Sequence, residues 1–272
     1  MIRIRRVSRS HVAVCALSSV WLAFVAPHRG VETQPAPEHE AATESEAWVP
    51  TADALTPFVL AVMDSYPDDG KHAYWWPRGD EGPKGWIGIT KDLVYDDKVL
   101  YAGDEKGRCF CCGLTFEVFF EACRLLAASE RRDFKLGKLD ARGVDAFRRA
   151  WFGSKRGDAC ARDALVSYGL GHDIEDPADA RPGDFLQFWR ASGSGHSAIF
   201  LRWIHGLRRD PKTGAMVPYR RGFEYWSTQK STGGIGVRRE FFTDEDDSSP
   251  GKSGVTRKET YIARAGSAPK RR

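Results

Sequence analysis

Several features that would define a protein class are missing from this sequence. The longest apolar run, from Val12 to Ala26, has 15 residues, whereas a membrane-spanning helix needs about 20. The cysteines at 109–112 have no second paired-cysteine motif and no His-x-x-x-His to complete them, which disfavours a zinc site. There is also no internal repeat. The sequence therefore implies neither a multi-span membrane protein nor a metal-stabilised module.

A strong excess of charge of one sign is also absent. The chain has 41 basic and 37 acidic residues, a formal net charge of +4, and part of the basic excess lies at the two ends, in Arg3–Arg6 and Lys270–Arg272. A nucleic-acid-binding protein would show a basic stripe interleaved with aromatic residues, and the middle of the linear sequence shows none. The charge supports only a weak attraction to an anionic cell wall or membrane surface.

The N-terminus has the parts of an export signal. Four arginines precede the apolar run Val12–Ala26, at positions 3, 5, 6 and 9. A basic segment followed by an apolar run of this length is typical of a secretory signal. Residues 1–26 are thus expected to be a signal peptide cleaved near Ala26, or an uncleaved membrane anchor. Either alternative predicts an exported protein, located in the periplasm, in the cell envelope or outside the cell.

Composition divides the rest of the chain. Residues 27–50 are rich in Pro, Glu, Ala, Thr and Ser and should form a disordered linker. Residues 51–265 form a single globular domain, since a chain of 272 residues with 42% hydrophobic and 12% aromatic content can bury one good core. Residues 266–272 are expected to be a flexible tail.

Hydrophobic periodicity changes at Pro182. Before it, the spacing predicts four helices: from Thr51 or Thr56 to just before Tyr66, over 112–127, from an Asp140 cap to Gly153, and from an Asp158 cap to Gly169. A short strand is expected near 93–95. After Pro182, short β-rich segments are expected at 185–189, 197–204, 223–228, 236–242 and 256–263, with 206–220 as a long hairpin loop. Helices followed by antiparallel strands predict an α+β fold.

The chemistry suggested by these elements is that of a thiol. Cys111 stands at the start of the helix expected over 112–127, and His196 stands at the start of a predicted strand. A helix N-terminus and an imidazolium both favour the thiolate, which is the reactive form of cysteine. The pairing points to a Cys/His hydrolase. Cys112 is an alternative nucleophile, about 100° further round the helix.

Three short blocks resemble the NlpC/P60 cysteine peptidases, a papain-like superfamily of cell-wall hydrolases and related amidases. They are Cys111–Leu114, Pro182–Phe185 and Gly195–Phe200, within a resemblance covering about residues 55–265. It departs from the family at Phe110, where an Asp is usual, and at Cys112, where a Ser is usual. The resemblance implies helices packed on an antiparallel sheet, with Cys111 as the nucleophile and His196 as the general base.

The resemblance also implies a third polar residue on the strand after His196. Gln229 is preferred there over Glu224 and Ser227, because amides occur at this place in the family. Asp184 is interpreted as a turn or cap residue and not as a catalytic acid. Trp75 and Trp76 are candidates to line a substrate groove, although most aromatic residues belong to the core.

The cysteine count fits an exported enzyme. Without Cys15, five cysteines remain, at 109, 111, 112, 123 and 160, and an odd count leaves one thiol free in an oxidising compartment. Two disulfides plus one nucleophile would fit, as would Cys123 and Cys160 buried on helices. No metal or organic cofactor is implied.

The leading functional hypothesis is an exported thiol amidase or endopeptidase that cleaves amide bonds in peptidoglycan stem peptides. Two alternatives remain open on the same fold. One is a secreted binding module that has lost its activity, and the other is an acyl or amide transferase that uses the same dyad.

Overall fold

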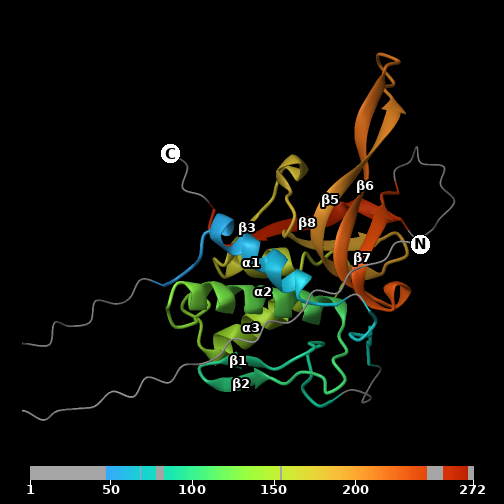
Figure 1. Ribbon diagram of the computed structural model, residues 1–272. Helices are drawn as coiled ribbons and strands as arrows, with labels where there is room; N and C mark the ends of the chain where they lie inside the picture. The colour runs from blue at the N-terminus through green and yellow to red at the C-terminus, as the bar shows by residue number, and fades with distance from the viewer. Residues whose placement is uncertain (1–46, 68, 78–82, 154, 244–253, 269–272) are drawn as a thin grey trace, which may run out of the picture. The chain divides into compact units, whose positions relative to one another are not determined.

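The computed structural model describes residues 47–67, 69–77, 83–153, 155–243 and 254–268, all within the compact unit Glu46–Arg272. This region combines helices and antiparallel sheets, so the α+β prediction is confirmed (Figure 1). In chain order the elements are α1 (Ala52–Asp64), β1 (Leu93–Tyr95), β2 (Lys98–Tyr101), α2 (Cys111–Ser129), α3 (Ala141–Phe152), α4 (Ala161–Ser167), β3 (Gly171–Asp173), the 3-10 turn η1 (Pro177–Asp179), β4 (Phe185–Arg190), β5 (Gly195–Arg209), β6 (Met216–Gln229), the 3-10 turn η2 (Lys230–Thr232), β7 (Gly234–Phe241) and β8 (Val255–Ala265).

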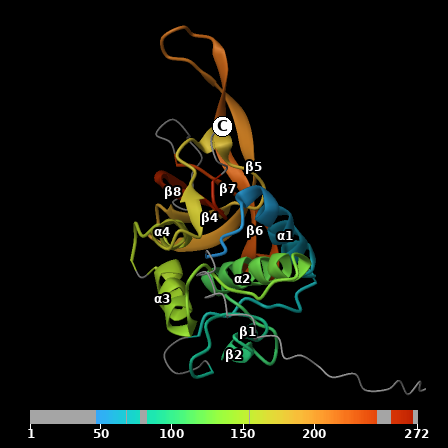
Figure 2. The same ribbon diagram turned by 90° about the vertical axis from the view of Figure 1, so that its left-hand side faces the viewer.

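The main sheet has six strands in the order β3-β8-β4-β5-β6-β7, and all its pairings are antiparallel. The hairpin of β1 and β2 lies on the other side of the helices from this sheet (Figures 1 and 2). Two apolar clusters form the interior. The larger joins the helices to Phe185, Ile199 and Trp226 of the sheet, and the smaller is centred on sheet residues such as Phe188 and Phe223.

Helix α2 is the centre of the larger cluster. Most of its side chains are buried, including Phe116, Phe119 and Phe120, none of which is more than 1% exposed. The fully buried Trp151 of α3 packs on Phe116, Phe119 and Phe185, with ring centroids 5.1–5.8 Å apart. A helix apolar on nearly all sides is fixed by packing, so its first residue, Cys111, has a rigid support.

Most of the predicted helices are found at the expected places. Thr51 caps α1 and Asp140 caps α3, each accepting a backbone N–H through its side chain. The predicted cap at Asp158 is wrong. The N-cap of α4 is Cys160, with φ +50°, and the Asp158 carboxylate instead accepts the backbone N–H of Lys155 at 3.0 Å.

The expected hairpin loop at 206–220 is also wrong. β5 and β6 continue as a paired ladder, His205 opposite Arg220 and Arg209 opposite Met216, to a turn at 210–215. Sequence patterning missed the ladder because this ribbon packs against no core on either face, so its residues do not alternate between apolar and polar. Strand β3 was missed for a similar reason, since it has three half-buried residues.

The two ends of the described domain lie together. Ser267 donates its backbone N–H to Pro50 O at 2.8 Å, and Gly266 donates to Leu170 O at 2.8 Å. Trp48, within the expected linker, packs on the core and donates to Glu130 at 3.1 Å. The ordered domain therefore includes residues 47–50 on one side and extends to Ser267 on the other.

The remaining predictions for the ends fall outside the described part of the chain. These are the signal or anchor at 1–26, the linker up to residue 46 and the tail from 269. Among the helices that the structure does describe, none combines the length and apolar character required to cross a bilayer.

A candidate thiol active site

Cys111 is the first residue of α2, and the residue before it explains its setting. Phe110 occupies the N-cap position with extended backbone and provides no side-chain hydrogen bond. Its buried ring contacts Trp76, Trp86 and Phe152, with centroids 4.6–6.0 Å apart. Phe110 therefore contributes aromatic packing and leaves the first amides of the helix uncapped by its side chain.

Gly113 allows α2 to approach a neighbouring segment closely. A Cβ atom at this position would lie 2.3 Å from the carbonyl oxygens of Ile87 and Gly88. The buried carboxylate of Glu117 fixes the same segment, because it accepts the backbone N–H of Thr90 at 2.7 Å and the Thr90 hydroxyl at 2.6 Å. The glycine of the Cys-Cys-Gly-Leu motif is thus required by packing around the start of the helix.

His196 lies at the beginning of β5 and is 6% exposed. A Cβ on Gly195 would lie 2.7 Å from the Trp189 ring, so a larger residue immediately before the histidine would displace that ring. The imidazole is flanked by the rings of Phe188 and Tyr225, with centroids at 5.5 and 5.6 Å. These two rings restrict the imidazole to a narrow range of orientations.

Cys111 and His196 line the same pocket, which has a volume of about 490 Å³. Its walls come from the start of α2, the ends of β4 and β5, and the segments before α2 and α4. The lining residues are Tyr74, Trp76, Cys111, Cys112, Phe152, Gly153, Cys160, Gln187, Trp189, Gly195, His196 and Ser197. The predicted nucleophile and base, 85 residues apart in the sequence, therefore share one cavity.

The electrostatics of the pocket distinguish the two adjacent thiols. The pKa of Cys111 lies well below its ordinary value, and the largest cause is a hydrogen bond from the Cys112 thiol. The positive charge of His196, its ring N–H and the Ser197 amide also lower this pKa. Together these four effects outweigh burial, which raises it. The hydrogen bond to Cys111 and burial raise the pKa of Cys112. Cys111 is consequently the thiolate of the pair. The separation of about 100° around the helix predicts that the two side chains point in different directions. Both thiols nevertheless line the same pocket.

Burial disfavours the thiolate form of the other cysteines of the described region. Burial raises the pKa of both Cys109 and Cys160 to about 12, and it also raises the pKa of Cys123. All five described cysteines are free thiols. The expectation of two disulfides is therefore wrong for this structure, and the alternative of Cys123 and Cys160 as buried thiols describes it better.

Gln229 lies at the end of β6 and does not line the pocket. β5 and β6 pair with Ile199 opposite Trp226, and continuing that register brings Gln229 level with His196. In the structure the Gln229 Oε1 atom accepts the Tyr225 hydroxyl at 2.9 Å, whereas Gln229 Nε2 and His196 Nε2 are both buried without a hydrogen-bond partner. Gln229 is close in register but makes no direct bond to the imidazole.

The two tryptophans proposed for the groove separate. Trp76 is 55% exposed and lines the pocket. Trp75 instead stacks on Trp86 at 5.1 Å and under the Arg108 guanidinium at 3.6 Å. Of the two, only Trp76 lines the pocket, and its role in substrate binding stays a prediction.

Two pocket residues were missed by sequence reasoning. Tyr74 lines the pocket, and burial together with the nearby Cys111 thiolate raises its pKa to about 12. Gln187 accepts the Ser197 hydroxyl at 2.6 Å beside the thiols. Tyr74 adjoins the tryptophan pair named in the sequence analysis. Gln187 is buried between Leu186 and Phe188, which are also buried, and it carries no local signal.

Asp184 has a structural role in this site. Its buried carboxylate accepts Nε and Nη2 of Arg264 at 2.7 and 2.9 Å, and the backbone N–H of Arg181 at 2.7 Å. Gly183, with φ +95°, makes the preceding turn. The interpretation of Asp184 as a turn residue agrees with this geometry, and the ion pair with Arg264 on β8 adds a tie across the sheet.

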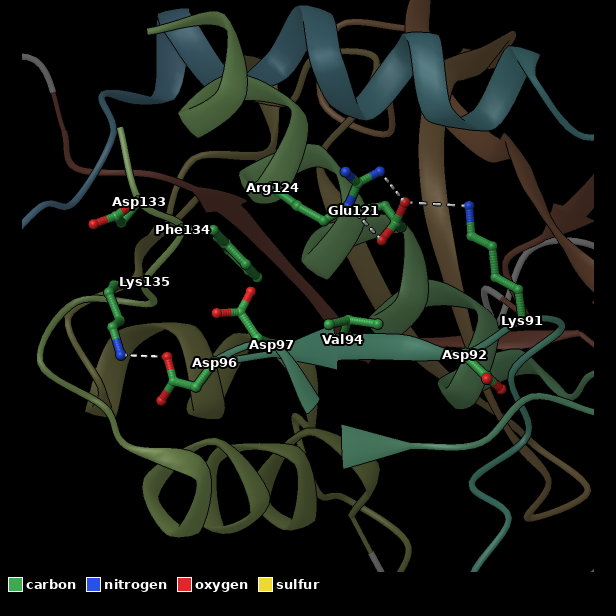
Figure 3. A pocket seen from close by; sticks show the side chains of 10 residues that line it. All are labelled: Lys91, Asp92, Val94, Asp96, Asp97, Glu121, Arg124, Asp133, Phe134 and Lys135. Atoms are coloured by element: carbon green, nitrogen blue, oxygen red, sulfur yellow. Dashed lines mark hydrogen bonds and ion pairs between the residues drawn. The ribbon is translucent and has the colours of Figure 1, made fainter. Parts of the chain in front are cut away.

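A second hollow, of about 820 Å³, lies beside the middle of α2 and the β1–β2 turn (Figure 3). It contains no thiol or imidazole. Its charges pair locally: Glu121 bonds Lys91 at 3.3 Å and Arg124 at 2.9 Å, and Lys135 bonds Asp96. This hollow therefore has no group suited to the chemistry of the first pocket.

Within the described ranges, no set of three or more His, Cys, Asp or Glu side chains is arranged to hold a metal ion. Comparison of the chain with protein-family models, with curated proteins and with solved structures finds no match.

Proposed function

We propose that this protein is a thiol hydrolase with a papain-like fold of the NlpC/P60 type. The observation that carries the proposal is the shared pocket of Cys111 and His196, in which the environment lowers the pKa of one thiol and raises that of its neighbour. A low-pKa thiol in an accessible pocket next to an imidazole is the arrangement of an activated cysteine nucleophile.

The chemistry is acyl transfer to water. The Cys111 thiolate attacks an amide carbonyl carbon, and the C–N bond of the tetrahedral intermediate breaks as His196 gives its proton to the departing amine. Water, deprotonated by His196, then attacks the thioester and releases the acid and the free thiolate. The alternative nucleophile, Cys112, keeps its proton under these conditions because its pKa is raised.

The developing oxyanion would be stabilised by donors near the start of α2. The side chain of Phe110 makes no hydrogen bond to the first amides of the helix. These N–H groups point toward the N-terminal end of α2, and without a side-chain cap they are available to bind the oxyanion. The Tyr74 hydroxyl lines the same pocket and stays protonated near neutral pH, because its pKa is raised to about 12.

We assign Gln229 as the group that orients His196, with its amide turned half a rotation from the arrangement described above. The oxygen and nitrogen of an amide are assigned from the hydrogen-bond network. Gln229 is level with His196 in the register of β5 and β6. In the turned state, Oε1 would be available as an acceptor for the unpartnered His196 Nε2, and Gln229 Nε2 would bond the Tyr225 hydroxyl. Gln229→Ala should lower kcat more than Gln229→Glu, which keeps an acceptor.

The proposed substrates are amide bonds of peptidoglycan stem peptides, met by an exported protein in the periplasm, in the cell envelope or outside the cell. This substrate class follows from the resemblance of the three motif blocks to NlpC/P60 enzymes. The exposed Trp76 at the pocket mouth offers a flat apolar wall for such a peptide.

The test combines labelling with hydrolysis of peptidoglycan fragments. Cys111→Ser should lose hydrolysis, and His196→Ala should lower it by about 100- to 10,000-fold. The two losses should not add, since nucleophile and base act as one unit. Cys112→Ser should be mild, and Cys123→Ser is the matched control at a buried thiol away from the pocket.

Other outcomes identify the alternatives. An ordinary cysteine thiol has a pKa of about 8.5. If Cys111 reacts with iodoacetamide no faster than such a thiol, and no peptidoglycan fragment is cleaved, the protein is a binding module. If Cys111 is reactive and an added amine is acylated in place of water, the protein is a transferase. Loss of activity in Cys112→Ser with activity kept in Cys111→Ser would reassign the nucleophile.

A further inference from the structure

The distal part of the β5–β6 hairpin forms an arm, defined here as residues 203–221. β4 pairs with β5 only as far as Ile199, and β7 pairs with β6 only from Gly222 onward. In both ribbon views the arm extends away from the sheet and from the helices (Figures 1 and 2). At the base of the arm, Trp203 packs on the smaller apolar cluster and Arg220 O accepts Arg257 Nη2 at 2.8 Å. Beyond this base, the two-stranded ribbon exposes both faces and both edges to its surroundings.

The arm concentrates the positive charge of the protein. Its 19 residues contain five basic side chains and one acidic side chain, a net charge of +4 that equals the net charge of the entire 272-residue chain. The acidic residue, Asp210, accepts the backbone N–H groups of Lys212 and Thr213 in the turn, at 2.8 and 2.9 Å. Pairing of the two strands brings Arg208 and Arg209 of β5 onto the same ribbon as Arg220 and Arg221 of β6.

Aromatic rings and backbone hold several of these cations in place. The Arg208 guanidinium lies 5.4 Å from the Tyr219 ring centroid, and that of Arg220 lies 5.3 Å from Trp203. Arg209 donates to Gly214 O at 2.8 Å. A guanidinium on a ring face keeps donors for a further anion.

Two large apolar side chains are exposed among these charges. Leu207 is 65% exposed and Met216 is 56% exposed. Arg209 pairs opposite Met216, and Leu207 lies two residues before Arg209, so strand alternation places all three on one face of the arm. Exposed aliphatic groups beside arginines fit a boundary at which headgroup charge meets hydrocarbon.

We propose that the tip of this arm docks on a lipid surface that carries anionic headgroups. The basic side chains would meet the headgroup phosphates while Leu207 and Met216 enter the acyl boundary. An anionic polymer would use the arginines but would leave the two aliphatic side chains in water, and for this reason lipid is the better match. The docking does not depend on the thiol chemistry.

The test is sedimentation of the unit Glu46–Arg272 with vesicles. Both apolar clusters lie within this unit, and omitting the N-terminal segment removes an apolar run that would itself partition into lipid. We expect binding to vesicles of equal parts phosphatidylglycerol and phosphatidylcholine, weakened by salt, and little binding to phosphatidylcholine alone. Arg208→Gln/Arg209→Gln should weaken it by about 30-fold, and Leu207→Ser/Met216→Ser by about tenfold.

The matched control is Lys106→Gln/Lys138→Gln, which removes two exposed cations outside the arm and should leave vesicle binding unchanged. Thermal unfolding verifies that every variant is folded. Equal binding to neutral and anionic vesicles, or an equal loss in the control, would overturn the proposal. Binding to soluble polyphosphate that survives Leu207→Ser/Met216→Ser, without vesicle binding, would show the arm to be a polymer site.

Discussion

The buried ion pair between Asp184 and Arg264 provides a sharp test of the claim that Asp184 supports the fold and takes no part in catalysis. Both side chains are nearly inaccessible, at 0% and 9% exposure, and two hydrogen bonds of 2.7 and 2.9 Å join them. Asp184→Ala would leave a guanidinium buried without its counter-charge, and would leave the Arg181 amide without its carboxylate acceptor.

Removing one partner of a buried pair costs about 3–5 kcal/mol. For a domain of this size, each kcal/mol lowers Tm by about 2–4 °C, so Tm should fall by roughly 6–20 °C. The double variant Asp184→Ala/Arg264→Leu should recover much of the loss, because it removes the unpaired charge. Calorimetry or thermal circular dichroism measures all three proteins.

The matched control is the exposed pair Arg156–Glu259, joined at 2.8 Å. Glu259→Ala should cost no more than about 1 kcal/mol, as is usual at the surface. The reasoning fails if Asp184→Ala costs as little as the control, or if the double variant is no better than the single one. If folded Asp184→Ala lost the alkylation of Cys111 or the hydrolysis, Asp184 would have a role in the chemistry.

Three further predictions follow from packing and titration around α2. Trp151→Ala should cost about 3–5 kcal/mol, because Trp151 is fully buried, while Trp76→Ala, at a side chain 55% exposed, should change urea unfolding little. Gly113→Ala should lower the stability by about 1–3 kcal/mol and slow alkylation of Cys111, since the new Cβ would lie 2.3 Å from two carbonyl oxygens. The control is Gly236→Ala, where the atom nearest to the new Cβ lies at 3.4 Å. Equal effects of the two substitutions would refute the packing argument. Burial raises the pKa of Glu117 above its ordinary value of 4.5. Between these two pKa values the native state keeps a proton that the unfolded chain has released. The contribution of Glu117 to the free energy of unfolding is therefore fully present below pH 4.5 and is lost as the pH rises through the native pKa. The stability of Glu117→Gln relative to wild type should therefore improve from about pH 5 to about pH 8 in urea unfolding, and a constant or falling difference would contradict the sign.

The sequence predicted those parts of the site that depend on local geometry. Gly113 and Gly195 stand where a Cβ would collide with backbone or ring atoms, so their motifs mark the positions of Cys111 and His196. Capping by Thr51 and Asp140 is likewise local, because each side chain bonds an amide three residues away. Helix caps and glycine motifs depend on residues only a few positions apart, so they can be predicted from a single sequence.

What the sequence could not predict depends mostly on contacts between distant segments. The register that brings Gln229 level with His196, and the hydrogen bond that Tyr225 makes to its amide, arise only when β5 and β6 pair. The same pairing assembles the basic arm from two strands. The Asp158 cap was wrong because Cys160, with φ +50°, takes a backbone conformation that favours glycine.

Strand β5 runs from Gly195 to Arg209, with shifts in its pairing to β6 between Phe200 and Arg202 and between Ile204 and His205. One strand therefore bears the imidazole near its start and the arm tip at its end. At about 3.3 Å per residue, the 13 steps from His196 to Arg209 span at most about 43 Å. If the tip docks on a lipid surface as proposed, the length of β5 limits the distance between His196 and that surface to at most about 43 Å. Inserting two residues in each strand of the arm would keep every side chain on its face and lift the pocket by about 7 Å.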